Sequence, residues 1–155
     1  MTTSKCNICG AEYAWKDLAE TCASVPAEEG RFFVGQVFKI PHSFDKGISF
    51  DVVQSNKVER QTHSRQYNTW GFLMNPEGEV YSCSHMASDP RSLATRERAK
   101  LAIPTQEEMA KIRGYLTRVV FLDRCGEVAT PDRDRTQLAR DLAAHNFVAV
   151  DPSKL

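Results

Sequence analysis

The chain has 155 residues, of which 41% are hydrophobic and 26% are charged, and its 20 basic side chains balance its 20 acidic ones. This composition is typical of one globular domain and excludes an intrinsically disordered chain. A net charge of zero excludes a general electrostatic attraction to nucleic acid or to an anionic membrane. The sequence has no signal peptide and no apolar run of about 18 residues, so we expect a cytoplasmic protein without a membrane segment.

The cysteines suggest a metal site. Five cysteines, an odd number, argue against a disulfide framework. Cys6 and Cys9 are separated by two residues, and a turn of this length directs both thiolates at one tetrahedral ion. From Cys6 to Tyr13 the sequence resembles the first half of a zinc-ribbon or rubredoxin-type knuckle, although the second cysteine pair of that family does not occur. The resemblance implies structural zinc.

Residues 1–30 form the first of three blocks. A short helix is predicted around Ala14 to Ala23, because Trp15, Leu18 and Cys22 recur at helical spacing. Pro26 ends it. We expect this face of the helix to be buried. Cys22 is therefore predicted as a core residue in preference to a metal ligand.

Residues 31–85 predict an antiparallel sheet. Strands are expected over 31–40 and 48–53, and a hairpin joins Thr69–Met74 to Glu79–Ser84 through a Pro-Glu-Gly turn. The predicted register places Leu73 opposite Tyr81 and Gly71 opposite Cys83, with the large apolar residues of both strands on the other face. A polar loop is expected between Asn56 and Gln66.

Residues 86–155 predict helices. Thr105 and Glu108 form a capping box, and apolar residues follow it on one helical face: Met109, Ile112, Leu116, Val119 and Val120. A second helix is predicted to begin at Thr130 and Pro131 and to bury three residues: Leu138, Leu142 and Ala143. Residues 147–150 predict a short edge strand. The expected fold is therefore a single α+β domain over residues 1–155, with an antiparallel sheet packed by C-terminal helices.

Two sets of residues can complete the metal site. Cys83 and His85 leave the same face of a predicted strand, and with Cys6 and Cys9 they make a set of three sulfurs and one nitrogen. This is the preferred set. The alternative takes Cys22 as the third ligand and one histidine as the fourth.

No motif identifies a catalytic site. The sequence lacks a nucleophile elbow, a phosphate-binding loop, a dinucleotide fingerprint and a metalloprotease helix. A closed four-ligand zinc site would also leave no open position for a substrate. A hydrolase or transferase would instead need a pocket that joins Cys83 or His85 to a second polar group.

Basic residues gather in two segments. One contains Arg60 and Arg65, and the other contains Arg91, Arg96, Arg98 and Lys100. They predict either a phosphate-binding patch that extends to Arg118 or, more commonly, a solvated face with internal ion pairs. Three functions follow: a zinc-stabilised regulatory or inhibitory protein that binds a protein partner, a nucleic-acid-binding regulator, and a small enzyme. The first is preferred, and an exposed apolar patch would favour it.

Overall fold

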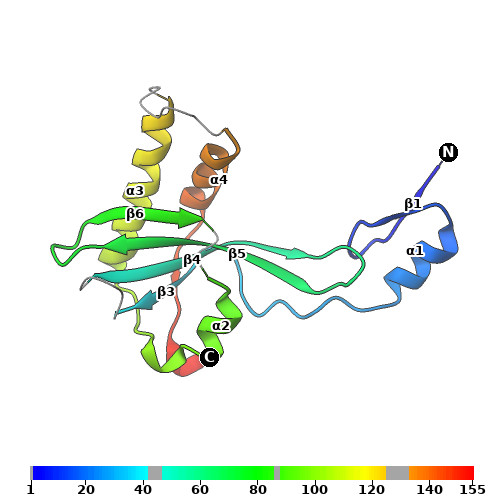
Figure 1. The fold of residues 1–155 in the computed structure, drawn as a ribbon, viewed down its shortest axis with the longest axis horizontal. Helices are drawn as coiled ribbons and strands as arrows, with labels where there is room; N and C mark the ends of the chain where they lie inside the picture. Colours follow the sequence, from blue (N-terminus) through cyan, green and yellow to red (C-terminus); the bar gives the residue numbers. More distant parts are fainter. Residues whose placement is uncertain (1, 42–46, 86–87, 125–132) are drawn as a thin grey trace.

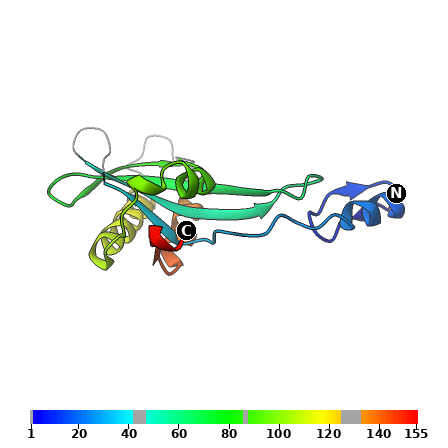
Figure 2. The same cartoon turned by 90° about the horizontal axis from the view of Figure 1, so that it is seen from below.

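The computed structural model describes residues 2–41, 47–85, 88–124 and 133–155, without the side chains of residues 85, 119–124 and 133–135. It has an α+β fold, as predicted, in two parts. A five-stranded sheet with helices on both faces forms the body, and a small N-terminal unit lies at the far end of the long β4–β5 hairpin (Figures 1 and 2).

The sheet is antiparallel except at one edge. Its strands lie in the order β6-β5-β4-β3-β7 and span Gln36–Ile40 (β3), Ile48–Val58 (β4), Arg65–Met74 (β5), Val80–His85 (β6) and Val148–Ala149 (β7). The last strand pairs parallel to β3, which confirms the predicted edge strand. β-branched and aromatic residues fill the central strands, as expected of a pleated surface buried on both faces.

The two faces of the sheet carry separate apolar clusters. On one face, Phe50, Val52 and Trp70 pack against α3 (Gln106–Arg124) and α4 (Arg133–Ala144). On the other, Phe38 and Val53 pack against the short helix α2 (Pro90–Thr95). Figure 1 shows α3 and α4 on one side of the sheet and α2 with the C-terminus on the other.

The predicted β5–β6 hairpin is present, but its register was predicted wrongly by one residue. Gly78 adopts a φ of 84°, and Gly78 N–H donates to the Asn75 carbonyl at 2.9 Å, as the turn requires. Leu73 pairs with Ser82, because a bulge interrupts the ladder between Leu73 and Met74. An inserted residue shifts every later pair by one position.

The helices predicted from the sequence are largely present. Thr105 and Glu108 cap each other reciprocally, at 2.9 and 3.1 Å, and α3 begins at the next residue after Thr105. Met109, Ile112 and Leu116 are buried, as predicted. Helix α2, capped by Asp89, lies within the segment that had been considered only as a basic stripe. The predicted start of α4 at residues 130–131, and the side chains of residues 119–120, lie outside what the structure describes.

Two short 3-10 helices, Arg98–Lys100 (η2) and Pro152–Lys154 (η3), complete the secondary structure of the body. Within the described part of the chain, no helix is both long enough and apolar enough to cross a lipid bilayer.

The N-terminal unit contains β1 (Ser4–Lys5), β2 (Glu12–Tyr13) and helix α1 (Lys16–Ala23). The helix is where it was predicted, but its apolar face is not buried. Trp15 is 71% exposed and Leu18 is 49% exposed, and the only buried residue of α1 is Ala19. Helix spacing located α1 correctly, but among the described residues its main contacts are with β1 and β2 of the N-terminal unit.

The expected polar loop is shorter than predicted, because both of its ends belong to strands. Four pairs, from Ser55 opposite Asn68 to Val58 opposite Arg65, extend the β4–β5 ladder beyond the body. Only residues 59–64 remain as a turn, with Gln61 and His63 at positive φ. This extension carries the tip of the hairpin to the N-terminal unit (Figure 2). We refer to residues 2–25 together with the hairpin tip, residues 59–64, as the knuckle.

Candidate metal centre

Three segments of the chain meet in the knuckle and bring four potential metal ligands together. Cys6 and Cys9 come from the turn after β1, Cys22 from α1, and His63 from the tip of the β4–β5 hairpin. Their ligand atoms all lie within 4.8 Å of one another. The group could therefore bind a metal ion through three sulfurs and one nitrogen.

The spacings match the edges of a tetrahedron. Cys9 Sγ lies 3.7 Å from Cys22 Sγ, and His63 Nε2 lies 3.3 Å from Cys22 Sγ and 3.5 Å from Cys6 Sγ. Bonds of about 2.3 Å from zinc to sulfur and about 2.0 Å to nitrogen, at tetrahedral angles, separate two sulfurs by about 3.8 Å and a sulfur from a nitrogen by about 3.5 Å. These three spacings are those expected between ligands of one ion, and the other spacings do not exceed 4.8 Å.

The Cys6–Cys9 turn is built by its backbone. Gly10 N–H donates to the Cys6 carbonyl and Cys6 N–H donates to the Ala11 carbonyl, both at 2.9 Å. Gly10 leaves the turn at a φ of 76°, a conformation that glycine adopts without steric cost. The chain therefore reverses immediately after Cys9, and β2 returns alongside β1.

The same backbone favours the thiolate form of both cysteines. Burial raises the pKa of the Cys9 thiol, but N–H groups of Gln61 and Ala11 stabilise its thiolate, and the pKa falls to about 6. The pKa of Cys6 is also lowered: burial opposes the shift, and hydrogen bonds from the N–H groups of Cys9 and Ile8 outweigh it. A thiolate is the form that binds a metal ion.

One ring nitrogen of His63 fixes the orientation of its imidazole. Nδ1 lies 2.5 Å from the Val25 carbonyl, which can only accept, so Nδ1 carries the proton and Nε2 is left with its lone pair toward the thiols. The imidazole is 1% exposed. The hydrogen bond to Val25 raises the pKa of His63. A fully buried imidazole with one satisfied nitrogen is a typical arrangement around a protein-bound metal.

Cys22 has a neighbour outside the group of four. The Tyr13 side chain forms a hydrogen bond with it, which lowers the pKa of the Cys22 thiol, while burial and the thiols of Cys6 and Cys9 raise it and prevail. The same contact raises the pKa of Tyr13 to about 12. Three thiolates in one small site repel one another, and a bound cation removes that repulsion.

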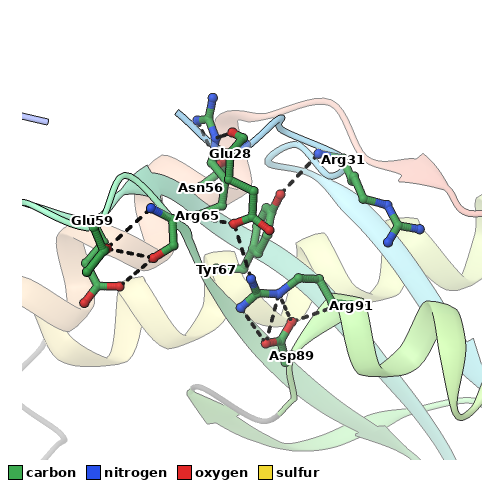
Figure 3. Close-up of polar contacts among 10 residues, drawn as sticks. Glu28, Arg31, Asn56, Glu59, Arg65, Tyr67, Asp89 and Arg91 are labelled. Carbon is green, nitrogen blue, oxygen red and sulfur yellow. Dashed lines mark hydrogen bonds and ion pairs between the residues drawn. The ribbon is translucent and has the colours of Figure 1, made fainter. Parts of the chain in front are cut away.

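A polar network holds the segment between α1 and β3 against the body (Figure 3). Glu28 accepts from the backbone N–H of Arg65 and forms an ion pair with Arg91 at 3.5 Å. Arg91 also pairs with Asp89 at 2.9 Å, and its guanidinium lies 5.4 Å from the centre of the Tyr67 ring. This network lies between the knuckle and the body, and we call it the anchor.

The structure assembles the alternative ligand set and not the preferred one. Among the described residues, Cys22 and His63 occupy the places that the sequence analysis gave first to Cys83 and His85. Cys83 lies on β6 opposite Phe72 and packs against the cluster under α3 and α4. His85 lies on the same strand, paired with Trp70, and its side chain is outside what the structure describes. The β4–β5 extension, which brings His63 to the cysteines, had no recognisable sequence signal.

The basic residues are spread over several contacts and do not form one stripe. Arg65 and Arg91 belong to the anchor. Arg98 donates to the Pro152 carbonyl at 3.1 Å, and Lys100 pairs with Glu97 at 3.1 Å. Arg60 lies in the turn at the hairpin tip, and Arg96 caps the C-terminal end of α2. Most of the positive charge therefore has an internal partner.

Comparison with protein-family models, with curated proteins and with solved structures finds no match for this chain. The candidate site is accordingly interpreted from its own geometry.

Proposed function

We propose that the knuckle is a structural zinc site and that the protein acts by binding a protein partner through the apolar side of α1. The observation that carries this proposal is the exposure of Trp15, at 71%, at the N-cap of the helix that supplies Cys22. A large aromatic side chain left in solvent on a rigid support is typical of an interaction site.

The donor set supports zinc. Three cysteine thiolates and one imidazole, spaced as a tetrahedron, suit zinc better than the oxygen-preferring magnesium or calcium ions. With all four positions taken by protein, the ion has no place for a substrate, so its role is to hold three segments together. The N-terminal unit has few buried apolar side chains of its own, which makes such a role necessary.

The proposed contact surface is a stripe of three exposed apolar residues: Trp15, Leu18 and Val25. Leu18 lies on α1, Trp15 is at its N-cap, and Val25 follows its C-cap, where the Val25 carbonyl contacts His63 of the metal site. We call them the apolar stripe.

The charge around this stripe suggests the chemistry of the partner. The knuckle contains four acidic side chains (Glu12, Asp17, Glu20 and Glu59) against three basic ones (Lys5, Lys16 and Arg60). Three thiolates and one zinc ion add a further net −1. We therefore expect a protein with an apolar groove edged by basic residues, because its charge complements the knuckle. The same acidity disfavours nucleic acid, whose phosphates would be repelled.

Enzymatic use of Cys83 has less support. A pocket does join Cys83 to polar side chains on the sheet. However, Cys83 is opposite Phe72 in the ladder and packs with the α3–α4 cluster, so its thiol belongs to the opposite face.

Metal analysis of the purified chain tests the first half of the proposal. We expect about one zinc ion per chain, lost in Cys22→Ser and in His63→Ala and retained in Cys83→Ser. Cys83→Ser is the matched control, because it removes a thiol without touching the group of four. Zinc retained in Cys22→Ser and lost in Cys83→Ser would contradict the assignment.

Site-specific photo-crosslinking tests the second half. A crosslinking residue at position 15 should capture a partner in the native host, and the same residue at Tyr81, an exposed aromatic on β6, should not capture that partner. With the partner purified, Trp15→Ala should weaken binding at least tenfold, about 1.4 kcal/mol or more, and Tyr81→Ala should leave it unchanged. Equal binding by the Trp15→Ala and unmodified chains would refute this surface.

A further inference from the structure

A pocket lies on the face of the sheet that is opposite α3 and α4. Two rows of paired residues cross β4, β5 and β6 there: Asp51, Gly71 and Ser84 in one row, and Ser49, Leu73 and Ser82 in the next. All six line the pocket, whose volume is about 260 Å³. Because side chains alternate along each strand, residues of these rows share one face and open toward the same space.

Asp51 is the unusual member of this face. It lies on the central strand β4, is 3% exposed, and its Oδ2 atom has no hydrogen-bond partner among the described residues. Ser88 provides its side-chain hydrogen bond. A buried carboxylate oxygen without a partner is costly in a folded protein and is uncommon outside binding or catalytic sites.

The residues around Asp51 leave room for a ligand. Gly71, its neighbour on β5, has no side chain to fill the space above the strand pair. Ile40 and Leu73 line the pocket with apolar surface, and the hydroxyl groups of Ser82 and Ser84 line it with polar atoms. The pocket thus combines one carboxylate, hydroxyl groups and an apolar wall.

We propose that this pocket binds a small aliphatic primary amine, with its ammonium group on Asp51 and its alkyl part against Ile40 and Leu73. An ammonium group has three donors: the Asp51 carboxylate takes one, which leaves two for hydroxyl groups that line the pocket. A carboxylate in a buried pocket repels anions and attracts a cation strongly, because water screens the charges little there.

Two other ligand classes fit less well. A divalent metal ion needs several oxygen ligands, often more than one of them a carboxylate, and Asp51 is the only carboxylate among the described residues that line the pocket. The volume of about 260 Å³ suits a small ligand better than a large cofactor, since pockets for drug-sized ligands begin at about 300 Å³. This site is separate from the metal centre, and its occupancy does not depend on zinc.

Titration of the zinc-loaded chain with n-butylammonium, followed by backbone amide NMR, tests the proposal. We expect saturable shifts in the pocket segments 49–51, 71–73 and 82–84, and no saturable binding of 1-butanol or of butyrate. Asp51→Asn should weaken n-butylammonium binding at least tenfold. Asp141→Asn, at an exposed position on α4, should leave it unchanged.

A second variant separates loss of the carboxylate from a change in fold. Ser82→Leu places a larger side chain at the edge of the pocket while Asp51 stays, and it should also weaken binding at least tenfold. The proposal is overturned if n-butylammonium does not bind, if its shifts map outside the pocket, or if 1-butanol binds equally well. It is also overturned if both Asp51→Asn and Ser82→Leu bind n-butylammonium like the unmodified chain.

Discussion

The knuckle and the body of this protein differ in how much apolar surface they bury. The body buries two clusters of large apolar side chains on opposite faces of one sheet, among them Trp70, Phe72 and Leu116. The buried apolar residues of the N-terminal unit are small: Cys6, Ala11 and Ala19. A unit with so little apolar burial requires another source of stability, and a metal ion is the usual one. Under the proposed function, one short chain combines a core-stabilised body with a zinc-stabilised knuckle.

Removal of the metal should have the largest effect, because it should unfold the N-terminal unit and leave the body folded. Structural zinc sites contribute roughly 10 kcal/mol or more of apparent binding free energy. We therefore expect chelation, or Cys22→Ser, to abolish amide-exchange protection in residues 2–25 while the central strands of the body stay protected. Hydrogen exchange measured by mass spectrometry checks this, with Cys83→Ser as control. Retained protection of the N-terminal unit without metal would mean that apolar burial suffices there.

A cavity in the body should destabilise the body and leave the knuckle intact. Leu116 is fully buried between α3 and the sheet, and Leu116→Ala should lower the free energy of unfolding of the body by about 2–5 kcal/mol. Denaturant unfolding measures this change. Zinc content should be unaffected, because no metal ligand contacts this cluster. Ile103→Ala, at a 53% exposed position, is the control and should change stability by less than about 0.5 kcal/mol.

The buried carboxylate should make the body sensitive to pH. Burial raises the pKa of Asp51 to about 6, while a side-chain hydrogen bond from Ser88 opposes the shift. The folded state therefore binds this proton more tightly than the unfolded state, whose Asp pKa is about 3.9. The resulting stability is full below pH 4 and is lost as the pH rises through 6.

Asp51→Asn should accordingly stabilise the body above pH 6, by up to about 3 kcal/mol, and the gain should vanish near pH 4. Unfolding curves of both chains at several pH values check the sign. A variant that is less stable than the unmodified chain at pH 8 would show that Asp51 has a favourable partner when ionised.

The smallest expected effect lies at the anchor between the two parts. Arg91 and its acidic partners Glu28 and Asp89 are each about 40% exposed, so Arg91→Ala should cost no more than about 1 kcal/mol. We expect unchanged zinc content but greater freedom of the knuckle relative to the body, measurable by small-angle scattering. Lys16→Ala, which removes an exposed ion pair within α1, should leave the scattering unchanged.

Much of the body was predictable because its signals are local. The capping box of Thr105 and Glu108, the positive φ of Gly78 and the alternation of Phe50 and Val52 each depend on a few neighbouring residues. The register of β6 was not predictable in this way. The bulge beside Met74 depends on how two strands fit together, and no residue type at that position specifies it.

The metal site shows the same division between ligands that the local sequence predicts and ligands that only the tertiary structure identifies. The sequence by itself determined Cys6 and Cys9 as a ligand pair, because a two-residue spacing closes a turn whatever the rest of the chain does. The choice of Cys22 and His63 over Cys83 and His85 was decided only by the tertiary structure. His63 is 57 residues from Cys6, and the length of the β4–β5 hairpin brings them together. Strand length beyond the body depends on pairing between distant segments, which a single sequence does not reveal.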